Sequence, residues 1–154
     1  MTSREYITRV NKIPFDERVP IEQLRKPAKQ WFKEKYKHNN QFVNEDTGQT
    51  IEISGNGIAH TIRDARDVFT IYSLDVLPEM IARMKQISHE DPKKKDDQGN
   101  PIRIERYETK VDVQGKAYTA HFVIKVFEIG GKNVRKMERL RYYNHYLEQG
   151  LTEV

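Results

Sequence analysis

A regular alternation of apolar and polar residues over positions 116–127 is the strongest constraint on the fold. Every second side chain is apolar, at Tyr118, Ala120, Phe122, Ile124 and Val126. Successive side chains of an extended strand point to opposite faces, so this spacing places all five on one face. The segment predicts a β-strand with one face in a core and the other face, which carries His121 and Lys125, outside it.

Turn sequences on both sides of this strand predict an antiparallel meander. Gln-Gly-Lys at 114–116 precedes it, and Gly130-Gly131 follows. Glycine accepts the backbone conformations that tight hairpins require. The first turn leads back to a predicted strand over about 102–113, whose inward parity switches midway, as at a β-bulge.

The segment after the second turn, residues 134–147, fits two structures. Helical spacing aligns Val134, Met137 and Leu147. Two-residue spacing instead collects one strand face, made of Arg135, Met137, Arg139, Arg141, Tyr143 and His145. The preceding Gly-Gly turn favours the strand.

The length of that turn decides whether a basic surface exists. A three-residue loop over 130–132 would set Arg141 opposite His121, on one face with Arg139, Tyr143 and Lys125. A two-residue loop would turn the arginines towards the helices, because a shift of one residue exchanges the two faces of a strand.

The N-terminal half of the chain carries helical patterns. Residues 1–20 have scattered apolar positions and two prolines, which predicts an arm. Apolar spacing beyond it predicts two short strands at 42–43 and 50–54 and three helices, at about 21–37, 57–66 and 75–87. We therefore expect one domain over 21–154, an α+β fold with N-terminal helices packed on one face of an antiparallel sheet of about four or five strands.

One short stretch, from Ile51 to Thr61, combines a predicted strand-to-helix connection with a candidate catalytic histidine. It reads as an alternating strand, a Gly-Asn-Gly turn and the start of a helix, with Asn56 as the expected N-cap. His60 falls within about a turn of that helix start. The partial positive charge there disfavours an imidazolium, so His60 is expected to be neutral and available as a base. An ordinary strand-to-helix connection is the simpler interpretation.

Composition excludes several classes of site. The chain has no cysteine, which removes disulfides, thiol nucleophiles and cysteine-ligated zinc. The five histidines lack metal-ligand spacing, and no phosphate-binding or dinucleotide glycine motif occurs, so we expect no metal and no cofactor. There is no apolar run of membrane-spanning length and no signal peptide, which leads us to expect a cytoplasmic protein that does not enter the membrane. A net charge of +4 permits binding to phosphates without requiring it.

The stretch 51–61, the apolar segment to Ile87, the long hairpin and the closing residues 142–147 together resemble a large polyvalent protein-associated domain of phages and mobile elements. The likeness covers roughly residues 40–148. Such domains are grouped with the barnase/EndoU/colicin/RelE-like nuclease fold. The resemblance implies a small, metal-independent RNA-cleaving toxin or effector module, an endoribonuclease.

The resemblance also implies roles for particular residues. His60 or His145 would be the base or acid, Arg139 and Arg141 would stabilise the charge of the phosphorane, and Tyr143 would position or protonate. We expect three further residues to bind substrate: Thr61, His121 and Lys125.

A second function stays open beside the first. A domain of this kind can lack activity and use the same face to bind a protein or a nucleic acid, as a phage-encoded inhibitor would. The partners expected are therefore RNA and a protein, either an immunity protein or a host target. The basic strand could equally be a solvated edge whose charges prevent aggregation, and the sequence does not give an oligomeric state.

Overall fold

The computed structural model describes residues 7–91, 101–129 and 137–149 of the chain. Its strands are β1 (Thr8–Val10), β2 (Gln41–Val43), β3 (Thr50–Ile53), β4 (Lys85–Glu90), β5 (Arg103–Val113), β6 (Lys116–Ile129) and β7 (Met137–Gln149). Its helices are α1 (Ile21–Lys35), α2 (Gly55–Asp64), α3 (Val68–Ser73), the 3-10 helix η1 (Leu74–Val76) and α4 (Leu77–Arg83).

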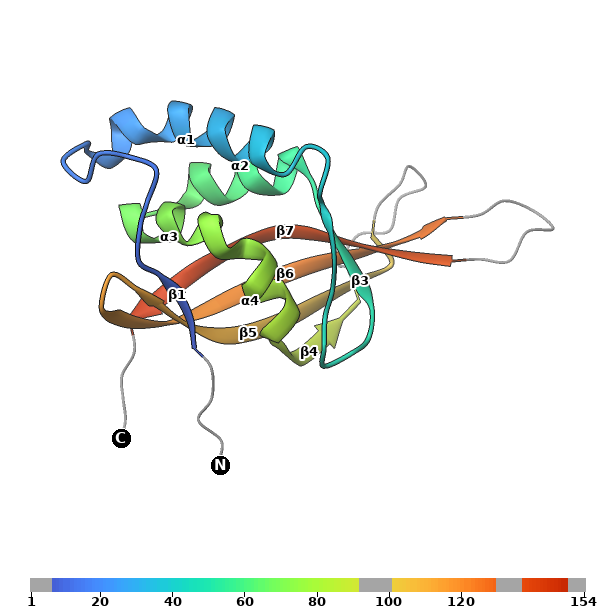
Figure 1. Cartoon of the computed structure of the whole chain (residues 1–154). Helices are drawn as coiled ribbons and strands as arrows, with labels where there is room; N and C mark the ends of the chain where they lie inside the picture. Colours follow the sequence, from blue (N-terminus) through green and yellow to red (C-terminus); the bar gives the residue numbers. More distant parts are fainter. Residues whose placement is uncertain (1–6, 92–100, 130–136, 150–154) are drawn as a thin grey trace.

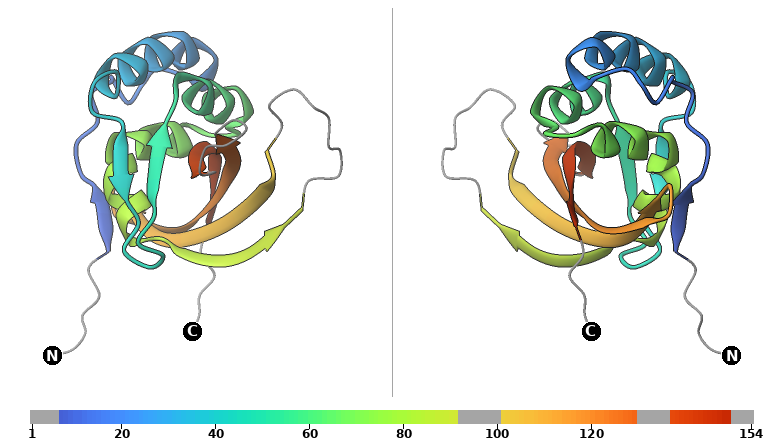
Figure 2. Two further views of the ribbon diagram at one scale, coloured as in Figure 1. Left: turned by 90° about the vertical axis from the view of Figure 1, so that its right-hand side faces the viewer. Right: turned by 90° about the vertical axis from the view of Figure 1, so that its left-hand side faces the viewer.

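All seven strands belong to one curled, mixed sheet (Figure 2). The meander β5–β6–β7 forms its middle, and the full order is β1-β5-β6-β7-β3-β2, with β4 also paired to β5. β1 joins β5 in parallel, and β3 joins β7 in parallel. The expected antiparallel sheet of four or five strands is thus corrected, because short segments of the N-terminal half extend the meander on both sides. One of them, β1, comes from the predicted arm and buries Val10.

The helices pack on one face of the sheet, as predicted, with α1 outermost over α2 and α3 (Figure 1). α1 follows Pro20 and runs through Pro27 without ending. The side chain of Asp67 caps α3 by accepting from the amides of Phe69 and Thr70. The helix expected over 75–87 is shorter: α4 ends at Arg83, and Ile87 lies on β4 with 57% of its surface exposed.

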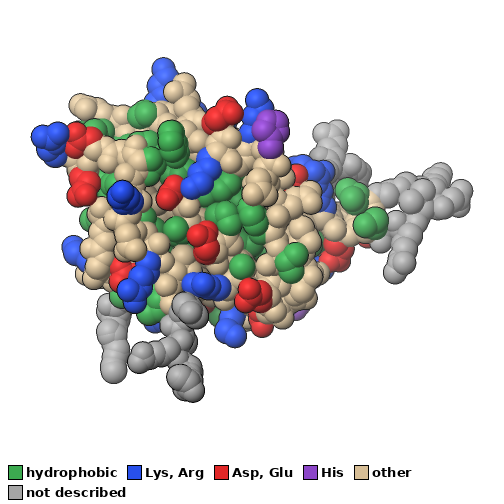
Figure 3. All heavy atoms as spheres, in the orientation of Figure 1, with side chains coloured by type: hydrophobic (Ala, Val, Ile, Leu, Met, Phe, Trp, Pro, Cys, Tyr) green, Lys and Arg blue, Asp and Glu red, His purple; other side chains and the backbone are tan. Residues whose placement is uncertain are grey.

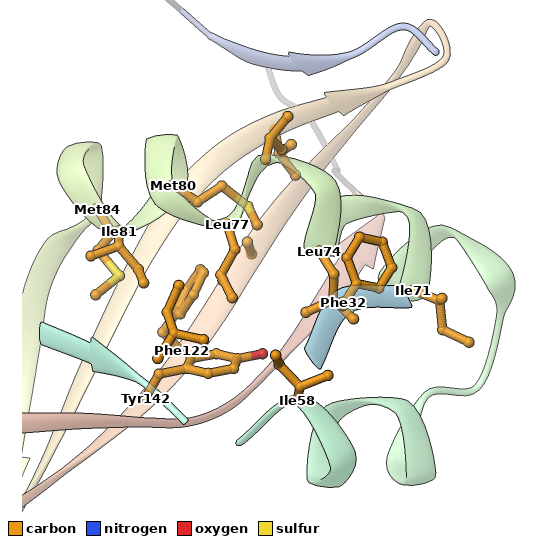
Figure 4. Close-up of a cluster of buried hydrophobic side chains, with 14 of the residues drawn as sticks. Phe32, Ile58, Ile71, Leu74, Leu77, Met80, Ile81, Met84, Phe122 and Tyr142 are labelled. Atoms are coloured by element: carbon orange, nitrogen blue, oxygen red, sulfur yellow. The ribbon is translucent and has the colours of Figure 1, made fainter. Parts of the chain in front are cut away.

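The core lies between the helices and the meander (Figure 4). Tyr142 and Phe122 contribute from the sheet, and Phe32, Ile58 and Met80 from the helices. Burying one such large side chain contributes on the order of 1.5–3 kcal/mol. The alternation predicted for residues 116–127 is confirmed, since all five of its apolar positions are buried.

Residues 137–149 form a strand, as predicted, although 134–136 lie outside the described residues. The register differs from both loops considered: Lys125 faces Arg141, and His121 faces Tyr146. The bulge expected in β5 is absent from its unbroken pairing with β6. A bulge lies instead between Val123 and Ile124 in the β6–β7 pairing, where β7 holds one extra residue.

Candidate functional site

The candidate site is built where β3 passes into α2 beside β7. Ser54 caps α2, because its side-chain oxygen accepts from the Gly57 amide at 3.2 Å; the expected cap, Asn56, instead lies in the first turn. Gly57 allows the helix to touch the neighbouring strand. A Cβ at Gly57 would overlap the carbonyl oxygen and ring of Tyr142, so glycine is required for this approach.

A cavity of about 170 Å³ lies at this junction. Four of the predicted site residues line it: His60 from α2, Lys125 from β6, and Arg141 and Tyr143 from β7. Tyr143 is the common contact. Its ring centroid lies 4.6 Å from that of His60, and Lys125 Nζ lies 3.7 Å from it on the ring face.

Two residues that line the cavity, His60 and Lys125, have a polar group without a hydrogen-bond or ion-pair partner within the described residues. His60 Nδ1 is buried without a hydrogen-bond partner, although the residue as a whole is half-buried. Burial lowers the pKa of Lys125 below its usual value, because desolvation disfavours the ammonium form. No carboxylate is paired with Lys125 within the described residues. An anion that entered the cavity would be attracted by the ammonium group of Lys125.

Glu52 of β3 accepts hydrogen bonds from both predicted site arginines, Arg139 and Arg141. Arg139 binds it through two nitrogens, Nε at 2.8 Å and Nη2 at 3.0 Å, and Arg141 donates through Nε at 3.2 Å. Burial opposes ionisation of Glu52, but the hydrogen bonds and charges of the arginines outweigh it and hold the pKa of Glu52 below its usual value. Arg139 does not line the cavity, whereas Arg141 does.

His145 is not at this site, and the structure corrects its expected role. The extra residue of the bulge turns it to the core side of β7, where it is 2% exposed and stacks on Phe122. Nδ1 lies 2.7 Å from the Tyr142 hydroxyl, and Nε2 lies 2.7 Å from Ser73 Oγ. Burial lowers the pKa of His145 to about 3, so it is a neutral residue of the core with almost no contact with solvent.

Thr61 belongs to the same buried chain. Its hydroxyl donates to the Gly57 carbonyl at 2.9 Å and contacts the Tyr142 hydroxyl. With 1% of its surface exposed, Thr61 cannot touch a ligand. The predicted role in substrate binding is replaced by a structural one, in which Thr61 and Tyr142 join α2 to β7.

His121 lies outside the cavity, on the face of β6 away from the helices. Nε2 is 2.8 Å from Glu148 and Nδ1 is 3.5 Å from Glu108, so carboxylates flank the ring on two sides. Its ring stacks on Tyr146. The expected alignment with Arg141 is wrong, because the β6–β7 register sets Lys125 there instead.

Residues 20–143 match the family described as large polyvalent protein-associated domain 3. The chain belongs to this family. The match spans α1 through about the first half of β7 and includes every residue that lines the cavity. No curated protein and no solved structure matches the chain.

Sequence reasoning missed several parts of the site in this polyvalent protein-associated domain. Glu52 was visible only as an acid between two apolar strand residues, and its partners come from a strand about 90 positions later. Ser54 and Phe127 also line the cavity and were not among the predicted site residues.

On the face seen in Figure 3, Lys and Arg side chains are interspersed with Asp and Glu side chains. Within the described residues there is no group of three or more potential metal-binding side chains. No helix in that part of the chain is long and apolar enough to cross a membrane.

Proposed function

We propose that this domain binds single-stranded RNA at the small cavity and cleaves it without a metal ion. The observation that carries the proposal is the convergence of His60, Lys125, Arg141 and Tyr143 on one cavity at the start of α2. Two cations, the positive end of a helix and an unpartnered imidazole nitrogen suit a phosphodiester. A volume of about 170 Å³ suits one such group.

The proposed reaction is attack of a ribose 2′-hydroxyl on the adjacent phosphate. His60 takes the 2′-proton, the bond between O2′ and phosphorus forms, and the bond from phosphorus to O5′ breaks. Arg141 and the first amides of α2 stabilise the negative charge of the phosphorane. Lys125 donates a proton to the departing O5′, a role that its lowered pKa favours. The products are a 2′,3′-cyclic phosphate and a 5′-hydroxyl.

A second candidate function, RNA binding without cleavage, is favoured by one observation. The structure brings one imidazole to the cavity instead of two, and Arg141 is already bonded to Glu52. A site with a single histidine and a partly neutralised arginine can hold a phosphate more readily than it can transfer one.

Incubation of labelled single-stranded RNA with the protein in excess EDTA tests the proposal. We expect cyclic-phosphate products from the wild type and a rate lower by roughly 10²–10⁴-fold in His60→Gln, the usual effect of losing a general base. His121→Gln is the matched control, since it removes an imidazole of the same sheet region that does not line the cavity. We expect the control to cleave at the wild-type rate.

Affinity for a 2′-O-methyl RNA, which cannot cyclise, separates the two functions. Binding by the wild type without any cleavage of ordinary RNA would favour the second function. Absence of binding would reject both. Equal cleavage by wild type and His60→Gln would reject the assignment of the base.

A further inference from the structure

A second, larger cavity of about 430 Å³ adjoins the first. The two share Ser54, Asn56 and Arg141, so they meet over the first turn of α2. In Figure 1, α1 ends and α2 begins at the same side of the helix layer. Residues from both of these ends line the larger cavity, among them Lys37 and Gly55. We propose that it is a second phosphate subsite, which holds the neighbouring phosphodiester of the same RNA strand.

The charged side chains of the larger cavity support this assignment. Lys33, Lys37 and Arg141 line it together with one carboxylate, Glu52, which is paired with Arg141 itself and with Arg139. Neither lysine has an ion-pair partner within the described residues. Lys35 of the same helix differs, because its Nζ is bonded to Asp75 at 2.7 Å. The two unpaired lysines are therefore free to meet a phosphate.

The backbone at this place also favours an anion. Lys33 crosses the start of α2, and its Cε would lie 3.3 Å from a Cβ at Gly55. No acidic residue occupies the first turn of α2. The amides of Gly55 and Asn56 precede the first bonds of that helix and have no acceptor within it. Cations and helix amides thus converge on the cavity from two different helices.

Because the two cavities adjoin, the ligand that fits them both is one that carries two consecutive phosphates. Arg141 borders both and would lie between consecutive phosphates. A positive groove that follows the backbone is typical of proteins that bind single strands without reading sequence. The inference rests on the proposed function, and it adds that efficient binding requires at least two phosphates on one strand.

Fluorescence anisotropy with two 2′-O-methyl ligands, a dinucleoside monophosphate and a tetranucleotide, tests the subsite. We expect the double variant Lys33→Gln/Lys37→Gln to bind the tetranucleotide about tenfold more weakly. The slope of the logarithm of its affinity against the logarithm of the salt concentration should fall by the equivalent of about one to two phosphate contacts. Its affinity for the dinucleoside monophosphate should equal that of the wild type. Lys26→Gln/Lys29→Gln, with the same charge change on α1 but outside both cavities, should match the wild type with both ligands.

Several results would overturn the subsite while leaving the proposed function intact. One is an unchanged tetranucleotide affinity in Lys33→Gln/Lys37→Gln, with weaker binding in Lys125→Gln. Another is an equal loss for both ligands, or an equal loss in the control pair, which would indicate only a general effect of charge. Failure of the wild type to bind either ligand would reject the proposed function and the subsite together.

Discussion

Two histidine–tyrosine pairs lie beside the middle strands of the sheet, and they differ in their neighbours. His60 and Tyr143 have ring centroids 4.6 Å apart, and His121 and Tyr146 have centroids 4.8 Å apart. Lys125 lies over Tyr143 in the first pair. Carboxylates flank the imidazole in the second. The same two residue types therefore have a cation beside them in one place and carboxylates in the other.

The supporting structure also differs between the two regions. The first pair joins a helix to a strand and depends on the close approach of α2 to β7 at Gly57. The second pair spans two adjacent strands, β6 and β7, whose register alone sets the contact. Substitutions that disturb the contact of α2 with β7, or the charged groups around a histidine, should therefore affect the region of His60 and Tyr143 more than the region of His121 and Tyr146.

Gly57→Ala should have the largest effect, because it separates α2 from β7. Alanine is favoured over glycine in a helix by up to about 1 kcal/mol, yet a Cβ at this position overlaps the backbone of Tyr142. We expect a net loss of about 2–3 kcal/mol in the free energy of unfolding, measured by urea denaturation.

Gly55→Ala is the matched control in the same helix. Its Cβ would meet only the flexible end of Lys33, at 3.3 Å, so its stability should stay within about 0.5 kcal/mol of the wild type. Similar losses in the two variants would show that the Gly57 contact with Tyr142 is not what limits the approach of α2.

His145 is almost completely buried, in contrast to His60 and His121. Its pKa is lowered to about 3 in the folded protein, against about 6.5 in an unfolded chain. Between these values the unfolded state binds more protons, so stability should fall as the pH drops from about 6.5 towards 3, by up to about 1.4 kcal/mol per unit from this residue.

His145→Phe should remove this part of the pH dependence. It keeps a ring against Phe122, while the Tyr142 hydroxyl retains Thr61 and the Ser73 hydroxyl retains the Thr70 carbonyl. Urea denaturation from pH 7 to pH 4 measures the slope. A slope equal to that of the wild type would mean that other groups cause the acid sensitivity.

Glu52→Gln should strengthen RNA binding at the first region. The carboxylate accepts hydrogen bonds from Arg139 and Arg141, and Arg141 lines the cavity of the proposed site. Its removal frees both guanidinium groups, and we expect an affinity for 2′-O-methyl RNA about fivefold higher, or roughly 1 kcal/mol. Anisotropy titrations measure this, with a steeper salt dependence as the second sign. Weaker binding would show instead that Glu52 holds Arg141 in its binding position.

Most of the fold could be predicted from the pattern of apolar residues and glycines along the sequence. The strand over 116–127, the strand nature of 137–149 and the helices on one sheet face follow from side-chain periodicity and glycine turns. The two parallel pairings were not accessible, because strands as short as β1 and β3 carry too little pattern to indicate a partner. The sheet was therefore expected to be smaller and wholly antiparallel.

The residues of the candidate site could also be predicted only in part, because local pattern does not reveal pairing between distant segments. His60, Lys125, Arg141 and Tyr143 were identified and line one cavity. His145 was placed with them by strict two-residue spacing, which one extra residue in β7 reverses. A bulge depends on the packing of both strands, so a single strand's sequence does not reveal it. Glu52 was missed because its partners depend on the pairing of β3 with β7.

The smallest effect is expected from Glu108→Gln/Glu148→Gln, which removes two negative charges beside His121. This change in net charge is twice that of Glu52→Gln, but Glu108 and Glu148 line neither of the two cavities, whereas Glu52 lines the larger one and is bonded to Arg141, which borders both. Charges farther from a phosphate than a Debye length, about 8 Å at physiological salt, are largely screened. We expect less than about a twofold change in RNA affinity in the same anisotropy assay. A gain as large as that of Glu52→Gln would mean that overall charge, and not the arrangement around His60, governs binding.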